Sequence, residues 1–269
     1  MGDKEVRALS STTVANSDRA PAQLTLLGEP AVDGIPVGSA TSSTARIIAF
    51  LALRGPTTRP RVAAALWPEA TEERAQGSIR TALWRLQRSC PGLIDVAASR
   101  VGLNRALQVD YHEVTRLGHE QLLDDGQASL ALMPRCDWFV RLLSEVELLP
   151  GWDEDWVAQE QERFRQLRLH VLEMLSTTLS RQHRFGLALE AALAAQRADP
   201  LRESAYRATI EVHLAEGNLC EARRQFLACC RMLREELGVA PSPATIELGE
   251  RMGANVTRIL ERVPRARWA

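Results

Sequence analysis

Residues 77–90 read GSIRTALWRLQRSC and combine an apolar stripe with a basic face that carries a tryptophan. At 3.6 residues per turn, one side of a helix here holds Ile79, Ala82, Leu83, Leu86 and Cys90. The opposite side holds Arg80, Thr81, Trp84, Arg85 and Arg88. Burial of an apolar stripe is ordinary for a helix at the surface of a protein. An exposed indole among arginines is less ordinary, because it forgoes burial unless something covers it.

The segment before this helix predicts strands and then two shorter helices. Residues 24–38 alternate between apolar and polar side chains, which is typical of strands. Asp33-Gly34 between the apolar runs indicates a tight hairpin turn, because both residues tolerate a positive φ. Residues 42–53 and 57–67 are expected to be helical, and each is followed by residues that stop a helix.

The order of the predicted elements is that of a winged helix-turn-helix domain. The third helix is expected over residues 72–90, with acidic residues in its first turn. Short strands are expected at 93–97, 101–104 and 106–111. In a winged helix-turn-helix, the last of the three helices enters the major groove of DNA.

The second half of the chain, from about residue 117, predicts helices only and contains an internal repeat of about 34 residues. Such a period, with small residues where two helices meet, is typical of a tetratricopeptide repeat. Two repeats need flanking helices as caps, and residues 154–168 and 243–262 are expected to supply them. The repeat pairs Leu172 with Tyr206, Leu179 with His213, Ala188 with Ala222, Ala192 with Phe226, and Ala195 with Cys229. We therefore expect a mainly α protein with a small β component.

Composition indicates a cytoplasmic protein with a local positive charge. The 269 residues carry a net charge of -1, and no run of about 18 apolar residues could span a membrane. Residues 1–21 read as a flexible polar tail rather than a secretory signal. The five cysteines lack CxxC spacing, which favours free thiols in a reducing compartment. Residues 72–105 contain six arginines and three acidic residues, so positive charge is focused on the third helix and the hairpin after it.

Two interpretations of the basic face remain open from the residues alone. In the first, arginines contact guanine or phosphate, Thr81 meets a thymine methyl, and Trp84 packs on sugar or a methyl group. Arg100 and Arg105 would then contact phosphate or the minor groove from the wing. In the second, the face is a solvated surface whose tryptophan is covered by another part of the protein, and the two wing arginines are plain loop charges.

Catalytic motifs are missing from the sequence. The five histidines show no HExxH or His/Cys ligand spacing, and we expect them to be surface or repeat-packing residues. No GxxxxGK[ST] loop occurs, and Lys4 is the sole lysine. We predict no enzymatic activity, no cofactor and no metal site.

The sequence resembles the SARP regulators, which are antibiotic-pathway transcriptional activators of actinobacteria. The resemblance covers roughly residues 22–262. It rests on LTLLGEPAVDGIPV, RVAAALWPEATEERAQGSIRTALWRLQR, LLPGWDEDWVAQEQERFRQLRLHVLEML, and ADPLRESAYRATIEVHLAEGNLCEARRQFLACCRMLREELGVAPSPAT. The last two stretches are similar to the bacterial transcriptional activator domain.

The resemblance implies an OmpR-type winged helix at 22–115 and a tetratricopeptide-like activator domain at 117–269. It implies binding to direct repeats in double-stranded promoter DNA, as a homodimer on the DNA, and recruitment of RNA polymerase holoenzyme. DNA contact transfers to the third helix, at Arg80, Thr81, Trp84, Arg85 and Arg88, and the wing transfers to about 98–105. The alternatives are an effector-responsive repressor, or a helical-repeat adaptor for proteins with a degenerate winged domain.

Overall fold

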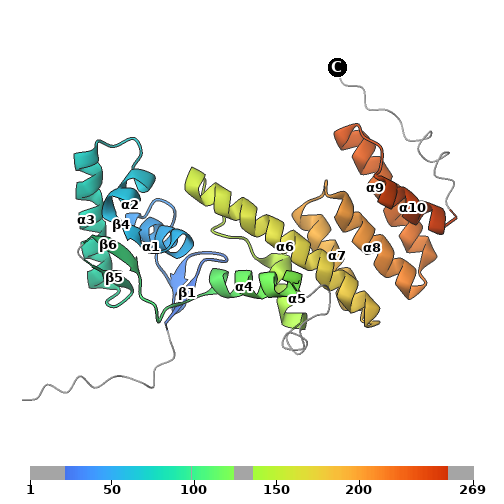
Figure 1. The fold of residues 1–269 in the computed structure, drawn as a ribbon, viewed down its shortest axis with the longest axis horizontal. Coiled ribbons are helices and arrows are strands. Elements are labelled where there is room, and N and C mark those ends of the chain that lie inside the picture. The colour runs from blue at the N-terminus through green and yellow to red at the C-terminus, as the bar shows by residue number, and fades with distance from the viewer. Residues whose placement is uncertain (1–21, 98, 124–135, 254–269) are drawn as a thin grey trace, which may run out of the picture.

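The computed structural model describes residues 22–97, 99–123 and 136–253. The described residues form an elongated molecule, with α3 at one end and α9 and α10 at the other (Figure 1). The predicted tail, 1–21, and the last part of the predicted capping segment, 254–262, lie outside the described residues. The predicted fold class is confirmed, because small sheets and three helices precede an all-helical half.

The first three strands and β7 form a four-stranded sheet, in the order β3-β2-β1-β7. Strands β2 and β3 are joined by Asp33 and Gly34, whose φ angles are 49° and 77°, so the predicted hairpin turn is present. The first strand pairs antiparallel with β2 and parallel with β7. The strands are β1 (Gln23–Thr25), β2 (Ala31–Val32), β3 (Ile35–Pro36) and β7 (Gln108–Val109).

Three helices and a second sheet complete the winged helix-turn-helix. The helices are α1 (Ser43–Arg54), α2 (Arg59–Leu66) and α3 (Glu72–Ser89). The second sheet has the order β4-β6-β5, and its strands are β4 (Thr57–Thr58), β5 (Ile94–Val96) and β6 (Arg100–Leu103).

Two predicted boundaries were wrong because partners distant in the sequence decide them. Thr57 does not begin a helix, since Thr57 and Thr58 form β4 and pair with β6. The strand predicted over 106–111 is reduced to β7, because α4 begins at Asp110. The Asp110 carboxylate accepts hydrogen bonds from the N–H groups of Leu26 (2.8 Å) and Leu27 (3.1 Å). Burial raises the pKa of Asp110, although these N–H groups oppose the effect.

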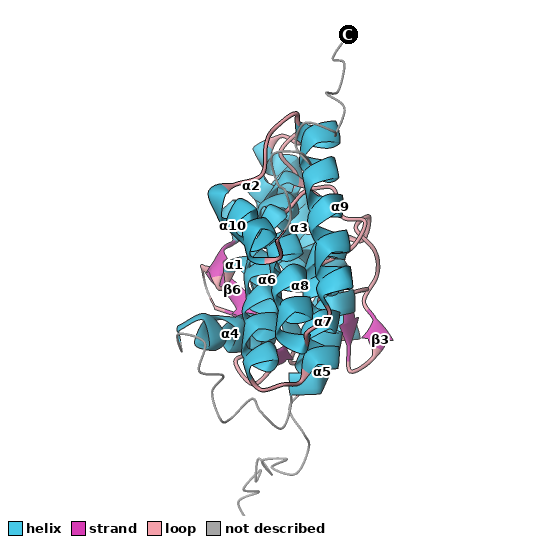
Figure 2. Cartoon of the chain, turned by 90° about the vertical axis from the view of Figure 1, so that its right-hand side faces the viewer, coloured by secondary structure: helices cyan, strands magenta, loops and turns pink. Residues whose placement is uncertain are grey.

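Two helix pairs form the repeats in the second half (Figure 2). The positions matched by the 34-residue period are buried in both copies, except that Tyr206 is half-buried. The expected capping helix at 154–168 is not a separate element, because those residues continue into the first repeat helix as α6. The helices are α4 (Asp110–Leu123), α5 (Cys136–Glu145), α6 (Asp155–Arg181), α7 (Phe185–Ala198), α8 (Glu203–Glu216), α9 (Leu219–Leu237) and α10 (Pro243–Arg251).

The two halves share one hydrophobic core rather than meeting at a polar interface. A single cluster of buried apolar side chains runs from Leu24 in β1 to Val212 in α8. The helix α4, which spans the predicted domain boundary, packs on β1 and β7 and also on α6. A short antiparallel bridge joins Leu27 to Leu148, so backbone pairing also links the halves.

Side chains of α1 and the start of α6 make further contacts between the halves. The rings of Phe50 and Trp156 meet edge to face, with centroids 5.3 Å apart. Arg46 pairs with Glu154 at 2.5 Å, and Arg54 pairs with the buried Glu160 at 3.0 Å. Because both arginines lie on α1, this helix fixes the N-terminal half against the helical half.

Glu203 holds the start of α10 against α8, and its charge gives a testable pH dependence. The backbone N–H and the hydroxyl of Ser242 both donate to Glu203 Oε1, each at 2.7 Å. Burial alone would raise the pKa of Glu203, but the hydroxyl of Thr245, the two Ser242 hydrogen bonds and the charge of Arg207 together outweigh it, and the pKa is lowered. A lowered pKa means that the carboxylate stabilises the fold above its unfolded pKa, and that this contribution is lost as the pH falls.

Glu203→Gln should therefore lower the free energy of unfolding by about 1–2 kcal/mol at pH 7. The difference from wild type should shrink below about pH 4. Urea unfolding across this pH range measures it. The matched control is Glu211→Gln, an exposed position on the same helix, which should behave like wild type. A loss in Glu203→Gln that does not change with pH would contradict the assignment.

Candidate nucleic-acid interface

Helix α3 presents two chemically different faces, as its sequence predicts. The apolar residues Ala75, Ile79, Ala82, Leu83 and Leu86 are buried. The residues proposed to contact DNA are all exposed: Arg80, Thr81, Trp84, Arg85 and Arg88. The helix therefore packs through one stripe and offers a basic face to solvent.

Trp84 is one of the most exposed large apolar side chains in the described part of the chain, at 58%. The guanidinium carbon of Arg88 lies 5.4 Å from the centre of its ring, which is a cation–π contact. No described residue buries the indole, so the interpretation that another of these segments covers Trp84 is wrong. The exposed surface is available to a partner molecule.

The arginines of this face carry no counter-charge among the described residues. Arg80 donates from Nε to the carbonyl of Gln76, and Thr81 donates to the carbonyl of Gly77, so these bonds stay within the helix. Neither Arg80, Arg85 nor Arg88 forms an ion pair with a described residue. The helical half contrasts with this, since it pairs Arg163, Arg165, Arg184, Arg202, Arg207 and Arg224 with acids.

A shallow groove of about 470 Å³ beside α3 adds a basic residue that the sequence reasoning missed. Arg74 and Arg85 both line it, together with Ser78 and Thr81 of α3 and Ser43 at the start of α1. The signal was present in the sequence, because these α3 positions follow helical spacing on one face. The basic surface is thus one turn longer toward the start of α3 than predicted.

The two wing arginines lie at opposite ends of β6 rather than in one cluster. Arg100 begins β6, and its Nη2 donates a hydrogen bond of 2.7 Å to the carbonyl of Pro56. Arg105 is exposed beyond the other end of the strand and forms no ion pair with a described residue. Residue 98, at the predicted tip, lies outside the described residues. The side chain of Arg100 is therefore partly fixed by its hydrogen bond to Pro56, whereas the side chain of Arg105 has no ion pair with a described residue.

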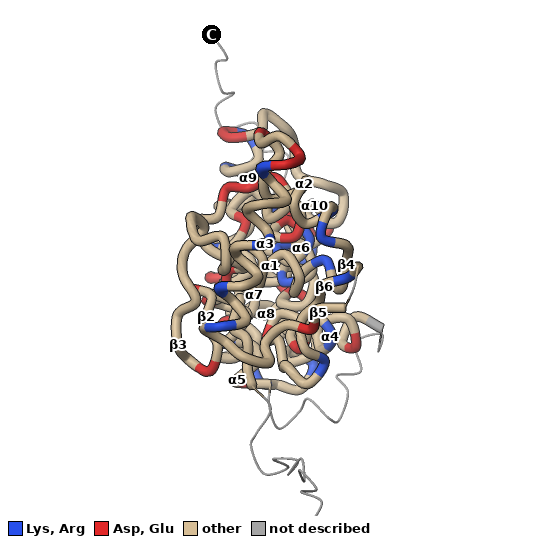
Figure 3. Tube along the Cα trace, turned by 90° about the vertical axis from the view of Figure 1, so that its left-hand side faces the viewer, with Lys and Arg blue, Asp and Glu red and all other residues tan. Residues whose placement is uncertain are grey.

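Helix α3, which carries the basic face, lies at one end of the molecule and away from α7, α8 and α9 (Figure 1). Figure 3 looks at this end, with basic residues in blue on α3 and β6. Guanidinium groups and an indole can bind phosphates, base edges and sugar rings. The face has the chemistry of a nucleic-acid contact and offers no general base or nucleophile.

Other kinds of site receive no support from the described residues. Within them, no group of three or more histidine, cysteine or acidic side chains could hold a metal ion. None of the described helices has the length and apolar character needed to cross a membrane. All five cysteines are free. Burial raises the pKa of Cys229 to about 12 and that of Cys230 to about 11, so both thiols stay protonated.

Comparison with known proteins places the second half of the chain in a described family. Residues 137–252 match the bacterial transcriptional activator domain. Mycobacterium tuberculosis EmbR, solved in complex with a low-affinity phosphopeptide, has a similar fold, with a TM-score of 0.68 and 17% sequence identity. The similarity covers 90% of this chain and 69% of the EmbR chain. No curated protein gives a significant match.

These findings agree with the resemblance noted in the sequence. The matched domain is a domain of transcriptional activators and not a class of enzymes. It follows a winged helix-turn-helix half in the order that the resemblance implies. Residues 137–252 are therefore similar to a domain of transcriptional activators, and the described fold is similar to that of EmbR.

Proposed function

We propose that the protein is a sequence-specific activator that binds double-stranded promoter DNA through the exposed face of α3. The observation that carries the proposal is the exposed, unpaired arginine set around Trp84 on the third helix of a winged helix-turn-helix. Exposed cations without counter-charges keep their attraction for an external polyanion. Burial of the opposite stripe fixes the orientation in which they are presented.

In this proposal α3 lies in the major groove, and each exposed side chain has a distinct role. The guanidinium group of Arg85 has no hydrogen-bond partner among the described residues, so it is free for a bidentate contact with guanine. Thr81 and Trp84 contact a thymine methyl or a sugar ring. Arg74, Arg80 and Arg88 neutralise phosphates, and Arg105 adds a phosphate contact from the wing side.

The helical half supplies the second part of the proposed function. We propose that residues 22–115 bind DNA and that the domain from residue 117 recruits RNA polymerase holoenzyme. The support is the family match to an activator domain and the resemblance to SARP regulators. The same resemblance supports binding of direct repeats as a homodimer, control of an antibiotic pathway, and action in the cytoplasm, where promoter DNA is found.

Substitution of one arginine tests the DNA contact. Arg85→Ala should weaken binding to the protein's own promoter about tenfold or more, because a bidentate base contact is worth about 1–3 kcal/mol. A mobility-shift titration measures the affinity, and wild-type binding should fall steeply as salt is raised. Arg231→Ala is the matched control, since Arg231 is exposed on α9 at the other end of the molecule.

Three outcomes of that titration would contradict the proposal. Equal binding by Arg85→Ala and wild type would remove Arg85 from the contact set. An equal loss in Arg231→Ala would show that general charge, rather than α3, determines binding. The absence of saturable duplex binding by wild-type protein would favour the adaptor for proteins.

A second substitution separates binding from stability. Trp84→Ala removes a mostly exposed side chain, so the free energy of unfolding should change by no more than about 0.5 kcal/mol. DNA affinity should nevertheless fall, because the indole is covered only in the complex. Thermal unfolding and mobility shift of the same preparation give both values. A variant that is destabilised, or that binds DNA like wild type, would show that Trp84 has another role.

A further inference from the structure

A second polar site lies in the helical half, outside the proposed DNA surface. A pocket of about 600 Å³ is lined by the C-terminal end of α5, the loop that leads to α6, the first half of α6, and the end of α7. Three arginines line it: Arg165, Arg168 and Arg197. Nothing in the proposed DNA contact requires a basic pocket at this place.

Arg168 is the feature that distinguishes this pocket. Its side chain is buried, at 9% exposure, and its Nη1 donates a 2.7 Å hydrogen bond to the carbonyl of Val146. Its Nε is buried without a hydrogen-bond partner, and no described carboxylate lies within ion-pair distance. Burial lowers the pKa of Arg168, and nearby Arg197 acts in the same direction against Glu147. Buried charges in proteins are normally paired, so this guanidinium lacks a counter-ion.

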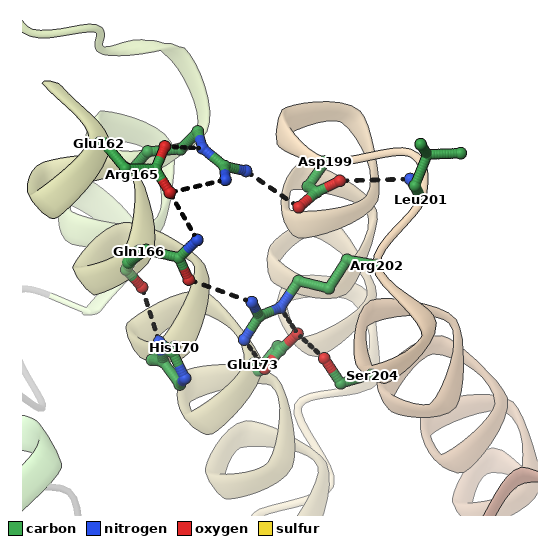
Figure 4. A network of polar contacts seen from close by, with 9 residues as sticks. All are labelled: Glu162, Arg165, Gln166, His170, Glu173, Asp199, Leu201, Arg202 and Ser204. Carbon is green, nitrogen blue, oxygen red and sulfur yellow. Dashed lines mark hydrogen bonds and ion pairs between the residues drawn. The ribbon is translucent and has the colours of Figure 1, made fainter. Parts of the chain in front are cut away.

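The other two arginines differ in how far the protein already neutralises them. Arg165 donates to Glu162 and, at 2.9 Å, to Asp199, so its charge is balanced within the network drawn in Figure 4. Arg197, in the last turn of α7, is exposed and pairs with no described acid. The positive charge available in the pocket is therefore that of Arg168 and Arg197.

Three carboxylates at the rim reduce the net positive charge of the pocket. Glu145, Glu147 and Asp153 also line it, but all three are exposed. Water and salt screen exposed charges far more than buried ones. The rim therefore reduces the attraction for an anion without neutralising Arg168. Apolar walls come from Leu148, Trp152 and Phe164.

We propose that this pocket binds a small molecule through an oxyanion, a carboxylate or a phosphate group, held by Arg168 and Arg197. The planar guanidinium group matches both oxyanions with paired hydrogen bonds. The volume is within the range of small-molecule sites, and the apolar walls accommodate the rest of the ligand. The bound anion supplies the negative charge with which Arg168 pairs, because no described carboxylate forms an ion pair with it.

Thermal unfolding and calorimetry of the full chain test this site without DNA. Inorganic phosphate and citrate, each titrated at constant ionic strength set with sodium chloride, should raise the melting temperature saturably. Stabilisation by phosphate alone or by citrate alone would identify which oxyanion the site prefers. Sodium chloride itself should give no saturable change.

Variants at the pocket sharpen the test. Arg197→Ala should bind the stabilising anion at least tenfold more weakly, and it should fold because Arg197 is exposed. Glu147→Gln should bind it more tightly, because a repelling rim charge is removed. Arg231→Ala, outside the pocket, should respond like wild type. The proposal is overturned if neither anion stabilises beyond sodium chloride, or if Arg197→Ala responds like wild type.

Discussion

The burial of α1 on every side is the constraint on which the rest of the structure depends. Its residues from Ile47 to Ala52 are all buried, as expected for a helix that is apolar around its whole circumference. Each fully buried large side chain contributes about 1.5–3 kcal/mol, so α1 is a major source of stability. It packs against α2, α3 and β6, while Phe50 and two arginines reach the start of α6. Together with α4 and the bridge between Leu27 and Leu148, this helix orients the winged domain on the helical repeats.

The position of the proposed DNA-contacting surface follows from that packing. The apolar stripe of α3 packs against α1 and α2. Its arginines and Trp84 therefore face solvent at one end of the molecule. Acids of the helical half pair with several of its own arginines and with Arg46 and Arg54 of α1, whereas no described acid pairs with Arg80, Arg85 or Arg88 of α3. Arg168 is buried and forms no ion pair with a described carboxylate, and it gives the second half a polar site of its own. The shared hydrophobic core and the backbone bridge between Leu27 and Leu148 connect the halves that carry these two surfaces.

Local patterns in the sequence predicted the helices, the hairpin at Asp33-Gly34 and the two faces of α3, because these depend on periodicity and turn chemistry. Features that depend on distant partners were not predictable. Thr57 is a strand residue only because β6 lies beside it, and Arg100 is held by Pro56. The exposure of Trp84 also depends on what the other segments leave uncovered. The position of Arg74 on the basic face, in contrast, could have been predicted, because it follows from helical spacing alone.

The most direct test of the proposed DNA contact is a cross-link between α3 and DNA. The photoreactive residue p-benzoylphenylalanine would be substituted for Trp84, and separately for Trp138, a half-exposed tryptophan on α5. Each protein would be irradiated in complex with its promoter duplex, and the attached strand and base would be mapped. We expect a cross-link from position 84 at a defined base and none from position 138. A complex that forms but cross-links from position 138 and not from position 84 would contradict the proposed contact.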